Sequence, residues 1–205
     1  MSATVLVDAG GANLGSVRYA LERLGADVRV SRDAAEIAAA SRVILPGVGA
    51  AASGMALLRE RDLNKVLREL TQPLLGICLG MQLLYEGSEE GGVECLGLIP
   101  GSVRKLAAEP ARDGKPAIRV PHMGWNTLQL RQSDPLLEGI GDGAHVYFVH
   151  SYAAPVDERT LATCQHGSPF AAVVRSGNRY GAQFHPERSS TVGMRLLANF
   201  LKIPA

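Results

Sequence analysis

Ten residues, 73–82, constrain the fold of this chain more than any other stretch, and they read PLLGICLGMQ. Residues 74–77 are a short apolar run typical of a buried strand, and residues 81–86 are good helix formers. Between them lies a Gly-x-Cys-x-Gly sequence with Cys78 at its centre. A strand, a sharp turn and a helix with a nucleophile at the apex form a nucleophile elbow, here with cysteine where the hydrolase motif has serine.

The two glycines beside Cys78 fit this interpretation. In such a turn Cys78 takes a strained backbone conformation, and a Cβ atom at Gly76 or Gly80 would clash with the adjacent strand and helix. Backbone N–H groups at the start of the helix would favour the thiolate over the thiol. The alternative is that Cys78 is a small buried hydrophobe, as free cysteines in apolar runs usually are. The glycines and the change from strand to helix favour a nucleophile.

Composition and charge restrict the class of protein. The chain has 205 residues, 46% of them apolar, and a formal net charge of +1. This suits one α/β domain over residues 1–205, and the lack of a charged block argues against nucleic-acid or membrane-surface binding. The sequence shows no secretory signal and no apolar run long enough to span a membrane. The three cysteines match no zinc motif, so we expect a cytoplasmic protein without metal or cofactor, in which Cys95 and Cys164 are structural.

The order of apolar segments predicts the fold class. Strands are expected at residues 4–8, 27–30 and 42–45, with helices from residue 14 and over 33–40. This β-α-β-α-β rhythm predicts a parallel sheet with right-handed crossovers and a ligand site at the carboxyl ends of its strands. From residue 117 the pattern becomes β-rich. We therefore expect an α/β fold: a central, mostly parallel twisted sheet flanked by helices, with an antiparallel, β-rich C-terminal half.

Three loops of the first half lead to further expectations. Residues 9–12 are glycine-rich but lack the full dinucleotide-binding pattern, so a tight turn is expected there, with Asn13 as a helix cap that is free to face the site. Ser53 is expected to cap a helix that runs to about residue 70. Residues 46–49 read Pro-Gly-Val-Gly. If this loop lies beside Cys78, its N–H groups can bind an oxyanion, and otherwise it is an ordinary turn.

A second stretch, residues 183–187, supplies the partners of a nucleophile; it reads Gln-Phe-His-Pro-Glu. His185 and Glu187 are two apart at the end of an expected strand, so their side chains would point the same way, with Pro186 fixing the backbone between them. A carboxylate orients an imidazole, whose other nitrogen can take the proton of a thiol. Cys78, His185 and Glu187 thus form a candidate nucleophile, base and orienting group. His150, at another strand end, is expected to line the pocket.

Residues 76–82 and 183–187 resemble the two signatures of class I, triad-type glutamine amidotransferases, and residues 46–49 resemble the oxyanion strand of that family. Residues 120–126, 147–152 and 185–189 resemble the branch that serves imidazole glycerol phosphate synthases in histidine biosynthesis. The resemblance spans nearly the whole chain, in order. Arg188 stands where this branch often has lysine, which keeps the charge but changes the hydrogen-bond geometry.

The resemblance implies a glutaminase reaction. Cys78 would attack the carboxamide of L-glutamine, and His185, oriented by Glu187, would protonate the leaving ammonia and then activate water against a glutamyl thioester. The oxyanion donors implied are Val48, Gly49 and Leu79. The implied substrate-binding residues are Gly47, Gln82, His150, Ser151 and Tyr152.

The resemblance also implies a partner. Ammonia would pass to a separate cyclase subunit, bound to this chain as a heterodimer. The cyclase would use it to form imidazole glycerol phosphate and aminoimidazole carboxamide ribotide. The glutaminase, a hydrolase by itself, would thus be part of a lyase in the complex. The glutaminase would stay nearly silent until the cyclase binds its ligand, with residues 47–49 as the switch. The candidate interface residues are Asn13, Trp125, Asn126, Tyr147 and Arg188; the alternative for Trp125 and Tyr147 is core packing.

Three alternatives remain open. The first is a glutaminase of the same fold that serves another synthase, such as pyridoxal phosphate synthase, although the Gly-Gly-Glu substrate motif of that type is absent from the sequence. The second is a cysteine peptidase or related α/β hydrolase, which would need no partner. The third is a catalytically dead binding protein, against which the intact Cys78, His185 and Glu187 argue.

Overall fold

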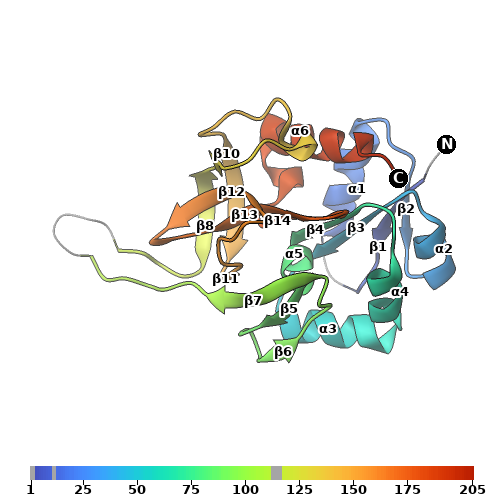
Figure 1. Ribbon diagram of the computed structural model, residues 1–205, viewed down its shortest axis with the longest axis horizontal. Coiled ribbons are helices and arrows are strands. Elements are labelled where there is room, and N and C mark those ends of the chain that lie inside the picture. Colours follow the sequence, from blue (N-terminus) through green and yellow to red (C-terminus); the bar gives the residue numbers. More distant parts are fainter. Residues whose placement is uncertain (1–2, 11–12, 112–116) are drawn as a thin grey trace.

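An eight-stranded sheet forms the centre of the computed structural model, which describes residues 3–10, 13–111 and 117–205 (Figure 1). Gly11 and Ala12 of the predicted glycine-rich turn lie outside these ranges. The strand order is β2-β1-β3-β4-β14-β13-β12-β9. The strands are β1 (Thr4–Val7), β2 (Val28–Ser31), β3 (Arg42–Gly47), β4 (Leu74–Cys78), β9 (Gln129–Leu130), β12 (Thr160–His166), β13 (Ser168–Ser176) and β14 (Arg179–Ala182).

The sheet has a parallel and an antiparallel half. Strands β2, β1, β3, β4 and β14 pair in parallel, whereas β14, β13, β12 and β9 pair antiparallel. Parallel strands need helical crossovers, whereas antiparallel strands can be joined by hairpins. This matches the change along the sequence from alternating strands and helices to a β-rich pattern. The predicted fold class is confirmed.

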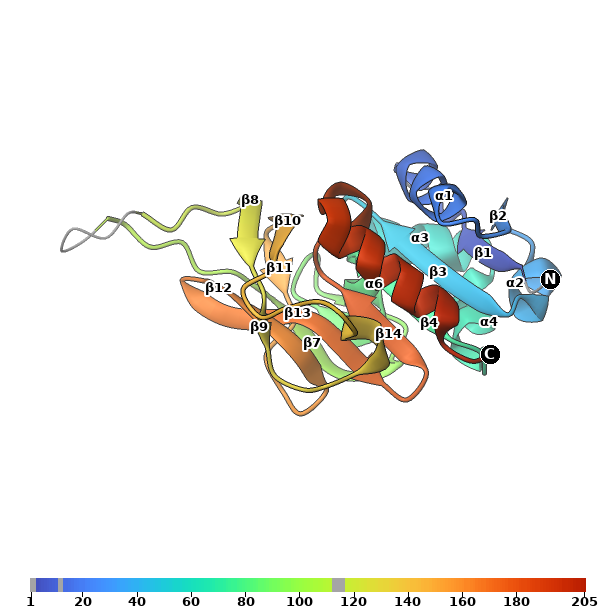
Figure 2. The ribbon, with the colours of Figure 1, turned by 90° about the horizontal axis from the view of Figure 1, so that it is seen from above.

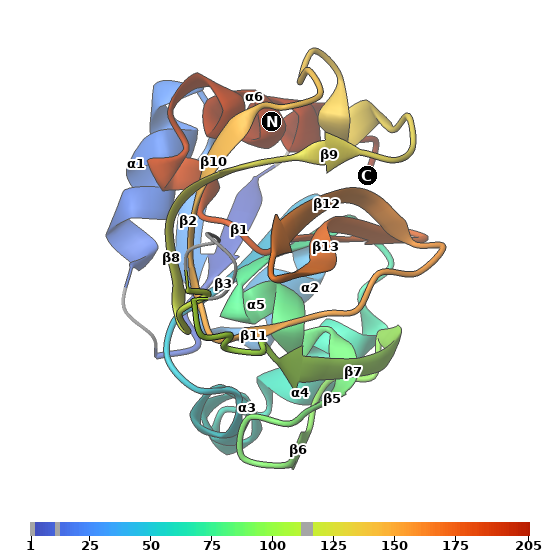
Figure 3. The same ribbon diagram turned by 90° about the vertical axis from the view of Figure 1, so that its left-hand side faces the viewer.

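Helices cover both faces of the parallel half (Figures 1 and 3). Alternation along β3 shows why: Ile44 packs in the core with α1 and α6, whereas Val43 and Leu45 pack in the core with α2, α3 and α4. Each fully buried Ile or Leu side chain of these cores contributes about 2 kcal/mol. The helices are α1 (Leu14–Arg23), α2 (Ala34–Ala39), α3 (Ala51–Glu60), α4 (Leu63–Glu69), α5 (Leu79–Leu83) and α6 (Ser190–Lys202).

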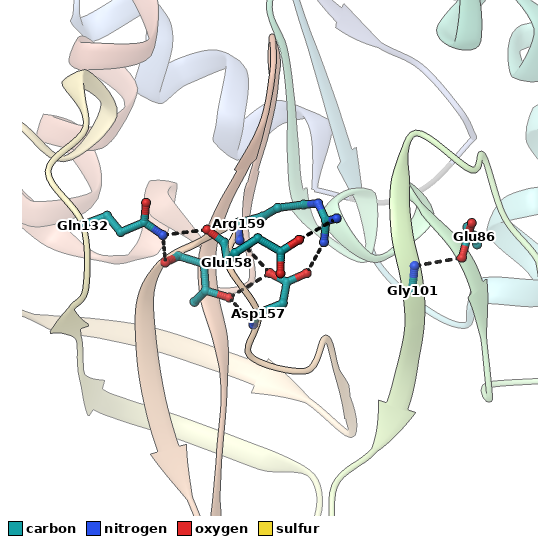
Figure 4. A network of polar contacts seen from close by, with 7 residues as sticks. Glu86, Gly101, Gln132, Asp157, Glu158 and Arg159 are labelled. Carbon is teal, nitrogen blue, oxygen red and sulfur yellow. Dashed lines mark hydrogen bonds and ion pairs between the residues drawn. The ribbon is translucent and has the colours of Figure 1, made fainter.

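Two smaller sheets adjoin the main one. The first has the order β11-β7-β5-β6, and the second pairs β10 with β8. Their strands are β5 (Tyr85–Ser88), β6 (Val93–Glu94), β7 (Ile99–Lys105), β8 (His122–Thr127), β10 (His145–His150) and β11 (Tyr152–Ala153). Figure 2 shows β8 and β10 side by side, away from α2 and α4. Between β5 and β7, the carboxylate of Glu86 accepts a hydrogen bond from the backbone N–H of Gly101 at 2.8 Å (Figure 4).

A polar network ties the turn before β12 to the segment after β9 (Figure 4). Asp157 Oδ1 accepts from the backbone N–H of Arg159 at 2.9 Å, and the Arg159 guanidinium contacts Asp157 at 2.5 Å and Glu158 at 2.7 Å. Gln132 Nε2 donates to the carbonyl oxygens of Glu158 at 2.7 Å and Thr160 at 3.1 Å. The turn that connects β11 to β12 is therefore closed by its own side chains.

Two predictions about local structure are wrong. The single helix expected from Ser53 to about residue 70 is divided into α3 and α4, because Asp62 takes a left-handed conformation with φ of 54°. Ser53 lies inside α3, and the first N–H of that helix, at Ala51, donates to the Glu90 carboxylate at 2.8 Å. The helix expected over residues 81–86 is instead the five-residue α5, and Tyr85 already belongs to β5.

Within the described ranges, no helix is both long and apolar enough to cross a lipid bilayer.

Candidate active site

The nucleophile elbow is formed as predicted. Strand β4 ends at Cys78 and α5 begins at Leu79, and Cys78 has φ of 53° and ψ of −112°, which side-chain-bearing residues rarely adopt. A Cβ atom on Gly80 would lie 1.8 Å from the carbonyl oxygen of Leu45, and one on Gly76 would lie 2.6 Å from the backbone of Met81. Both predicted clashes are confirmed. Because α5 is so short, the free N–H groups of its first turn matter more than its dipole.

The Pro-Gly-Val-Gly loop lies beside the nucleophile, as the oxyanion interpretation requires. Gly47 pairs with Cys78 in the parallel register of β3 and β4, and Val48 and Gly49 line the same cavity as Cys78. A Cβ atom on Gly47 would lie 2.8 Å from the backbone nitrogen of Gly80, so the elbow leaves room for glycine alone. Gly49 has φ of 93°, a region that favours glycine.

His185 and Glu187 meet, but by a different route from the one predicted. Their side chains are joined by a 2.8 Å contact between Nδ1 of His185 and Oε1 of Glu187. Strand β14 has already ended at Ala182, and a 3₁₀ turn, η2 (Pro186–Arg188), begins directly after His185. The backbone is extended at His185, but the expectation that it stays extended as far as Glu187 is wrong. Proline at the first position of a helical turn loses no hydrogen bond, so Pro186 starts the turn that brings Glu187 back to the ring.

Charges around His185 determine its protonation. Burial opposes the imidazolium, but hydrogen bonds to Cys78 and Glu187, together with their negative charges, raise the pKa of His185 to about 10. Burial likewise opposes the carboxylate of Glu187, but the hydrogen bonds from His185 and Asn13 and the imidazolium charge hold its pKa below the usual range. A cysteine, an imidazole and a carboxylate arranged in this order can act as nucleophile, proton carrier and orienting group.

Asn13 supports the triad and does not cap its helix. The predicted cap is wrong: Asn13 has φ of 80° and its side chain makes no capping hydrogen bond to α1. Instead its Nδ2 donates to Oε1 of Glu187 at 2.6 Å. The expectation that Asn13 faces the site is confirmed. Its predicted place in a partner interface stays a prediction.

One cavity of about 320 Å³ connects most of the predicted site residues. This volume is at the small end of the range for ligand pockets. Of the predicted residues, Val48, Gly49, Cys78, Leu79, Gln82, His150, Ser151, Tyr152 and His185 line it. Gly47 lies beside Cys78 in the sheet, and Glu187 lies behind His185 with its side chain fully buried. Within the described part of the chain, no group of three His, Cys, Asp or Glu residues is placed to hold a metal ion.

Sequence reasoning missed two polar residues of this site. Glu90 is the one carboxylate among the described residues that line the cavity. Gln183 is fully buried; its Nε2 lies 3.8 Å from Cys78 Sγ and its Oε1 accepts from Gln82 Nε2 at 3.0 Å. The position of Gln183 two residues before His185 was a signal that could have found it. Glu90 gave no such signal, because its place depends on the contact with the start of α3.

His150 borders the cavity as predicted, but its ring nitrogens face protein groups. Its Nδ1 lies 2.8 Å from the carbonyl oxygen of Tyr152, and its Nε2 lies 3.0 Å from Nδ1 of His122. Burial is the largest of the effects that lower the pKa of His150 to about 4 and that of His122 to about 3. Both rings are neutral at physiological pH, unlike His185.

The candidate interface residues differ in how they are exposed. Trp125 is 54% exposed, so core packing does not describe it, and its ring centroid lies 6.0 Å from that of Tyr147. Trp125 and Arg188 border a second hollow of about 770 Å³. Asn126 is directed inward, because alternation along β8 places it with His122, and its Nδ2 donates to the carbonyl oxygen of Gln165 at 3.0 Å.

Comparison with known proteins adds an independent finding. The sequence model of the family described as glutamine amidotransferase class I matches residues 5–203. A protein of Xanthomonas axonopodis pv. citri (strain 306), named imidazole glycerol phosphate synthase subunit HisH, is 60% identical over 203 residues, which are 99% of this chain and 98% of that protein. A protein of the same name from Xylella fastidiosa (strain Temecula1 / ATCC 700964) is 56% identical over 205 residues and the full length of both chains.

Solved structures share the fold. A crystal structure described as glutamine amidotransferase matches with a TM-score of 0.72 at 25% identity and covers 97% of each chain. A crystal structure of a glutamine amidotransferase from Thermotoga maritima matches with a TM-score of 0.67 at 16% identity, over 98% of this chain and 96% of that one. The second likeness concerns the fold alone.

Proposed function

The chain belongs to the class I glutamine amidotransferases, and from that premise we propose that it is the glutaminase subunit of an imidazole glycerol phosphate synthase. Residues 1–205 act as one glutaminase domain that hydrolyses L-glutamine to glutamate and ammonia. The observation that carries the proposal is the His185–Glu187 contact of 2.8 Å beside Cys78 at a strained elbow. The full-length likeness to subunits of that synthase supports the choice of pathway.

The first half of the proposed reaction forms a thioester. The Cys78 thiolate attacks the carboxamide carbon of glutamine, and the carbonyl oxygen takes the negative charge. Backbone N–H groups of Leu79 and of Val48 or Gly49 stabilise that oxyanion. The His185 imidazolium gives its proton to the leaving nitrogen, so the C–N bond breaks, ammonia departs and Cys78 holds the glutamyl group.

The second half of the reaction releases glutamate. His185, now neutral, takes a proton from water, and the hydroxide attacks the thioester carbon. The same N–H groups hold the second oxyanion until the C–S bond breaks and the Cys78 thiolate is restored. Glu187 keeps the ring oriented and stabilises its charged form at both stages, with Asn13 fixing the carboxylate.

Substrate recognition uses other residues of the cavity lining and their neighbours. Glutamine carries an α-ammonium group, and Glu90 supplies the carboxylate that pairs with it. Glu90 is fixed for this role by its hydrogen bond from the Ala51 N–H. The Gln82 carboxamide is held by the carbonyl oxygen of Tyr152 at 2.8 Å and by Gln183. Gly47, Ser151 and the backbone of Tyr152 complete the predicted contacts.

The proposed partner is a cyclase, bound in a heterodimer. The surface it covers includes Met123 and Trp125, which are large apolar side chains 64% and 54% exposed, and the hollow beside Arg188. Asn13 and Tyr147 connect this surface to the triad: the first bonds the triad carboxylate, and the second packs against Trp125. Ammonia released at Cys78 passes to the cyclase, and residues 47–49 switch the oxyanion site when the cyclase binds its ligand. The reaction takes place in the reducing cytoplasm, which a thiolate nucleophile needs.

Glutamate release in four mixtures tests the proposal. They are the chain alone, the chain with the cyclase of the same organism, both with the cyclase's nucleotide ligand, and that last mixture with Cys78→Ala. We expect weak release from the chain alone, a large rise in the third mixture and none in the fourth. If a different synthase partner activates the chain while the cyclase does not, the pathway is wrong and the glutaminase stands. Strong unassisted hydrolysis of peptides would instead favour a peptidase.

A further inference from the structure

A continuous series of hydrogen bonds runs from β8 to the glutamine cavity. Asn126 Nδ2 lies 3.2 Å from Nε2 of His122, and Nδ1 of His122 lies 3.0 Å from Nε2 of His150. Nδ1 of His150 lies 2.8 Å from the carbonyl oxygen of Tyr152. The register of the small sheet makes this possible, because His122 and His150 are direct partners in the β8–β10 pair.

One carbonyl group determines the direction of every bond in this series. The Tyr152 oxygen can only accept, so Nδ1 of His150 carries a proton, and the neutral ring is then an acceptor at Nε2. His122 must therefore donate from Nδ1 and accept at Nε2. The amide of Asn126 donates there, which agrees with its oxygen accepting from the Thr127 N–H at 2.8 Å. Both rings are thus held as the Nδ1–H tautomer.

The series continues to the nucleophile. The Tyr152 carbonyl oxygen that accepts from His150 also accepts from Nε2 of Gln82 at 2.8 Å. Gln82 donates in turn to Gln183 at 3.0 Å, and Gln183 Nε2 lies 3.8 Å from Cys78 Sγ. The orientation of the Gln82 carboxamide, on the wall of the cavity, therefore depends on a carbonyl that His150 fixes.

Packing holds the His122 ring in place. It is 4% exposed and lies between two rings, with centroids 4.8 Å from Phe148 and 4.1 Å from His166 and interplanar angles of 26° and 23°. Because the ring is stacked between two others, it cannot rotate freely, and its two nitrogens stay directed at Asn126 and His150. His122 itself does not line the cavity of about 320 Å³.

We propose that His122 is a positioning residue of the glutaminase site: its Nδ1–H holds His150, and through it the Tyr152 carbonyl and the Gln82 carboxamide, in the arrangement that receives glutamine. The inference rests on the proposed function and deepens it, since it concerns the same pocket. His122 touches neither the substrate nor the reacting sulfur. Its loss should therefore weaken glutamine binding more than it slows the chemical steps.

Two variants separate the hydrogen bond from the packing. His122→Phe keeps a ring between Phe148 and His166 but removes the donor, whereas His122→Asn removes the ring and retains an amide N–H near the position of Nδ1. His145→Asn is the matched control, because His145 is an exposed histidine of β10 outside the series. Glutaminase kinetics of each chain are measured with the cyclase and its ligand. Alkylation of Cys78 by iodoacetamide reports the reactivity of the sulfur without requiring glutamine to bind.

We expect His122→Phe to raise KM for glutamine about tenfold, with kcat and the alkylation rate within about twofold of wild type. His122→Asn should lie close to wild type, and His145→Asn should match it. An unchanged KM in His122→Phe overturns the inference, as does a KM that rises in His122→Asn but not in His122→Phe, since that pattern means packing. A wild-type chain without glutaminase activity contradicts the proposed function instead.

Nitrogen NMR of the histidine rings in the wild-type chain gives a test that no misfolded variant can obscure. The expected result at about pH 7 is a neutral ring with the proton on Nδ1 for both His122 and His150. This is informative whether or not glutamine is hydrolysed, because it concerns the hydrogen bonds alone. An imidazolium or an Nε2–H tautomer at either residue overturns the inference.

Discussion

Three buried histidines at or near one cavity show opposite behaviour. His185 and the His122–His150 pair are all buried, at 3%, 4% and 6% exposure, and burial acts to lower the pKa of each. His185 faces the Cys78 sulfur and the Glu187 carboxylate, and its pKa rises to about 10. The pair meets a carbonyl oxygen and another histidine, and the pKa values fall to about 4 for His150 and about 3 for His122.

Because all three rings are buried, it is their neighbours that account for the difference between them. An imidazolium beside a thiolate can deliver a proton to leaving ammonia. A neutral ring that donates from one nitrogen and accepts at the other can only hold its neighbours in place. The same residue type thus does chemistry at one position and holds its neighbours in place at another.

Removing the nucleophile has the largest expected effect. Cys78→Ala should lower ligand-activated glutamate release at least about 10⁴-fold, because no other described group of the cavity replaces the thiolate. The matched control is Cys95→Ala: that thiol is also buried, and burial raises its pKa to about 11, but it lies outside the cavity. Comparable loss of activity in both variants would mean that the effect concerns folding.

Removing the charge of the Glu187 carboxylate tests why the pKa of His185 is raised while those of His122 and His150 are lowered. Glu187→Gln keeps an oxygen for Nδ1 of His185 but loses the charge that favours the imidazolium, so we expect kcat to fall about 10²-fold. The pKa of His185 should also fall, and the alkaline limit of the pH–rate profile should move to lower pH. A profile that does not move contradicts the assignment of Glu187 as the charge partner.

Glu90→Gln tests the substrate side of the cavity. The substituted Gln side chain at position 90 can still accept a hydrogen bond from the Ala51 N–H through its amide oxygen. The first turn of α3 therefore keeps this hydrogen bond while the negative charge is lost. We expect KM for glutamine to rise about 30-fold with little change in kcat, because a charged hydrogen bond to the α-ammonium group is lost. Glu89→Gln, on the neighbouring residue, is the control. An equal rise in KM for both variants would mean that the loss of negative charge in general, and not a contact of Glu90 with the substrate, weakens binding.

The dependence of stability on pH gives the smallest expected effect. His122 and His150 have pKa values lowered by folding, so their contribution is present above about pH 6.5 and is lost as the pH falls toward 4. Each histidine adds at most about 1.4 kcal/mol per pH unit in that window. In His122→Phe the free energy of unfolding should therefore depend less steeply on pH, by the contribution of one histidine, as measured by urea unfolding between about pH 6 and 5. Equal slopes in the variant and wild type contradict a neutral buried His122.

His185 contributes with the opposite sign. Its pKa is raised by folding, so its stabilisation is present below about pH 6.5 and is lost as the pH rises toward 10. The acid-side difference between wild type and His122→Phe is therefore not produced by the triad histidine.

The sequence suffices to predict the elbow but not the groups that support it. Local constraints determine the turn, because Gly76 and Gly80 are needed where a Cβ atom would lie 2.6 Å and 1.8 Å from neighbouring backbone. The sequence predicts Asn13 as a helix cap, since a local rule cannot show that its amide reaches Glu187, 174 residues away. Pro186 suggests the end of an extended strand, although proline fits the start of a 3₁₀ turn equally well.

The His122–His150 pair shows a second limit of sequence reasoning. His122 has no acidic residue two positions away, so the pattern that selects His185 does not select it. Its partner is His150, 28 residues along the chain, and the two meet only because β8 and β10 pair in one particular register. Register between distant strands depends on the packing of the whole fold, which no short motif contains.

Trapping the covalent intermediate tests the central claim most directly. The chain, the cyclase and the cyclase's ligand are mixed with L-glutamine, quenched in acid within the first turnovers and digested for peptide mass mapping. A glutamyl group is expected on the peptide that contains Cys78, and none is expected on the corresponding peptide of Cys78→Ala. A glutamyl group on the Cys95 or Cys164 peptide, or glutamate release from Cys78→Ala at the wild-type rate, would contradict it.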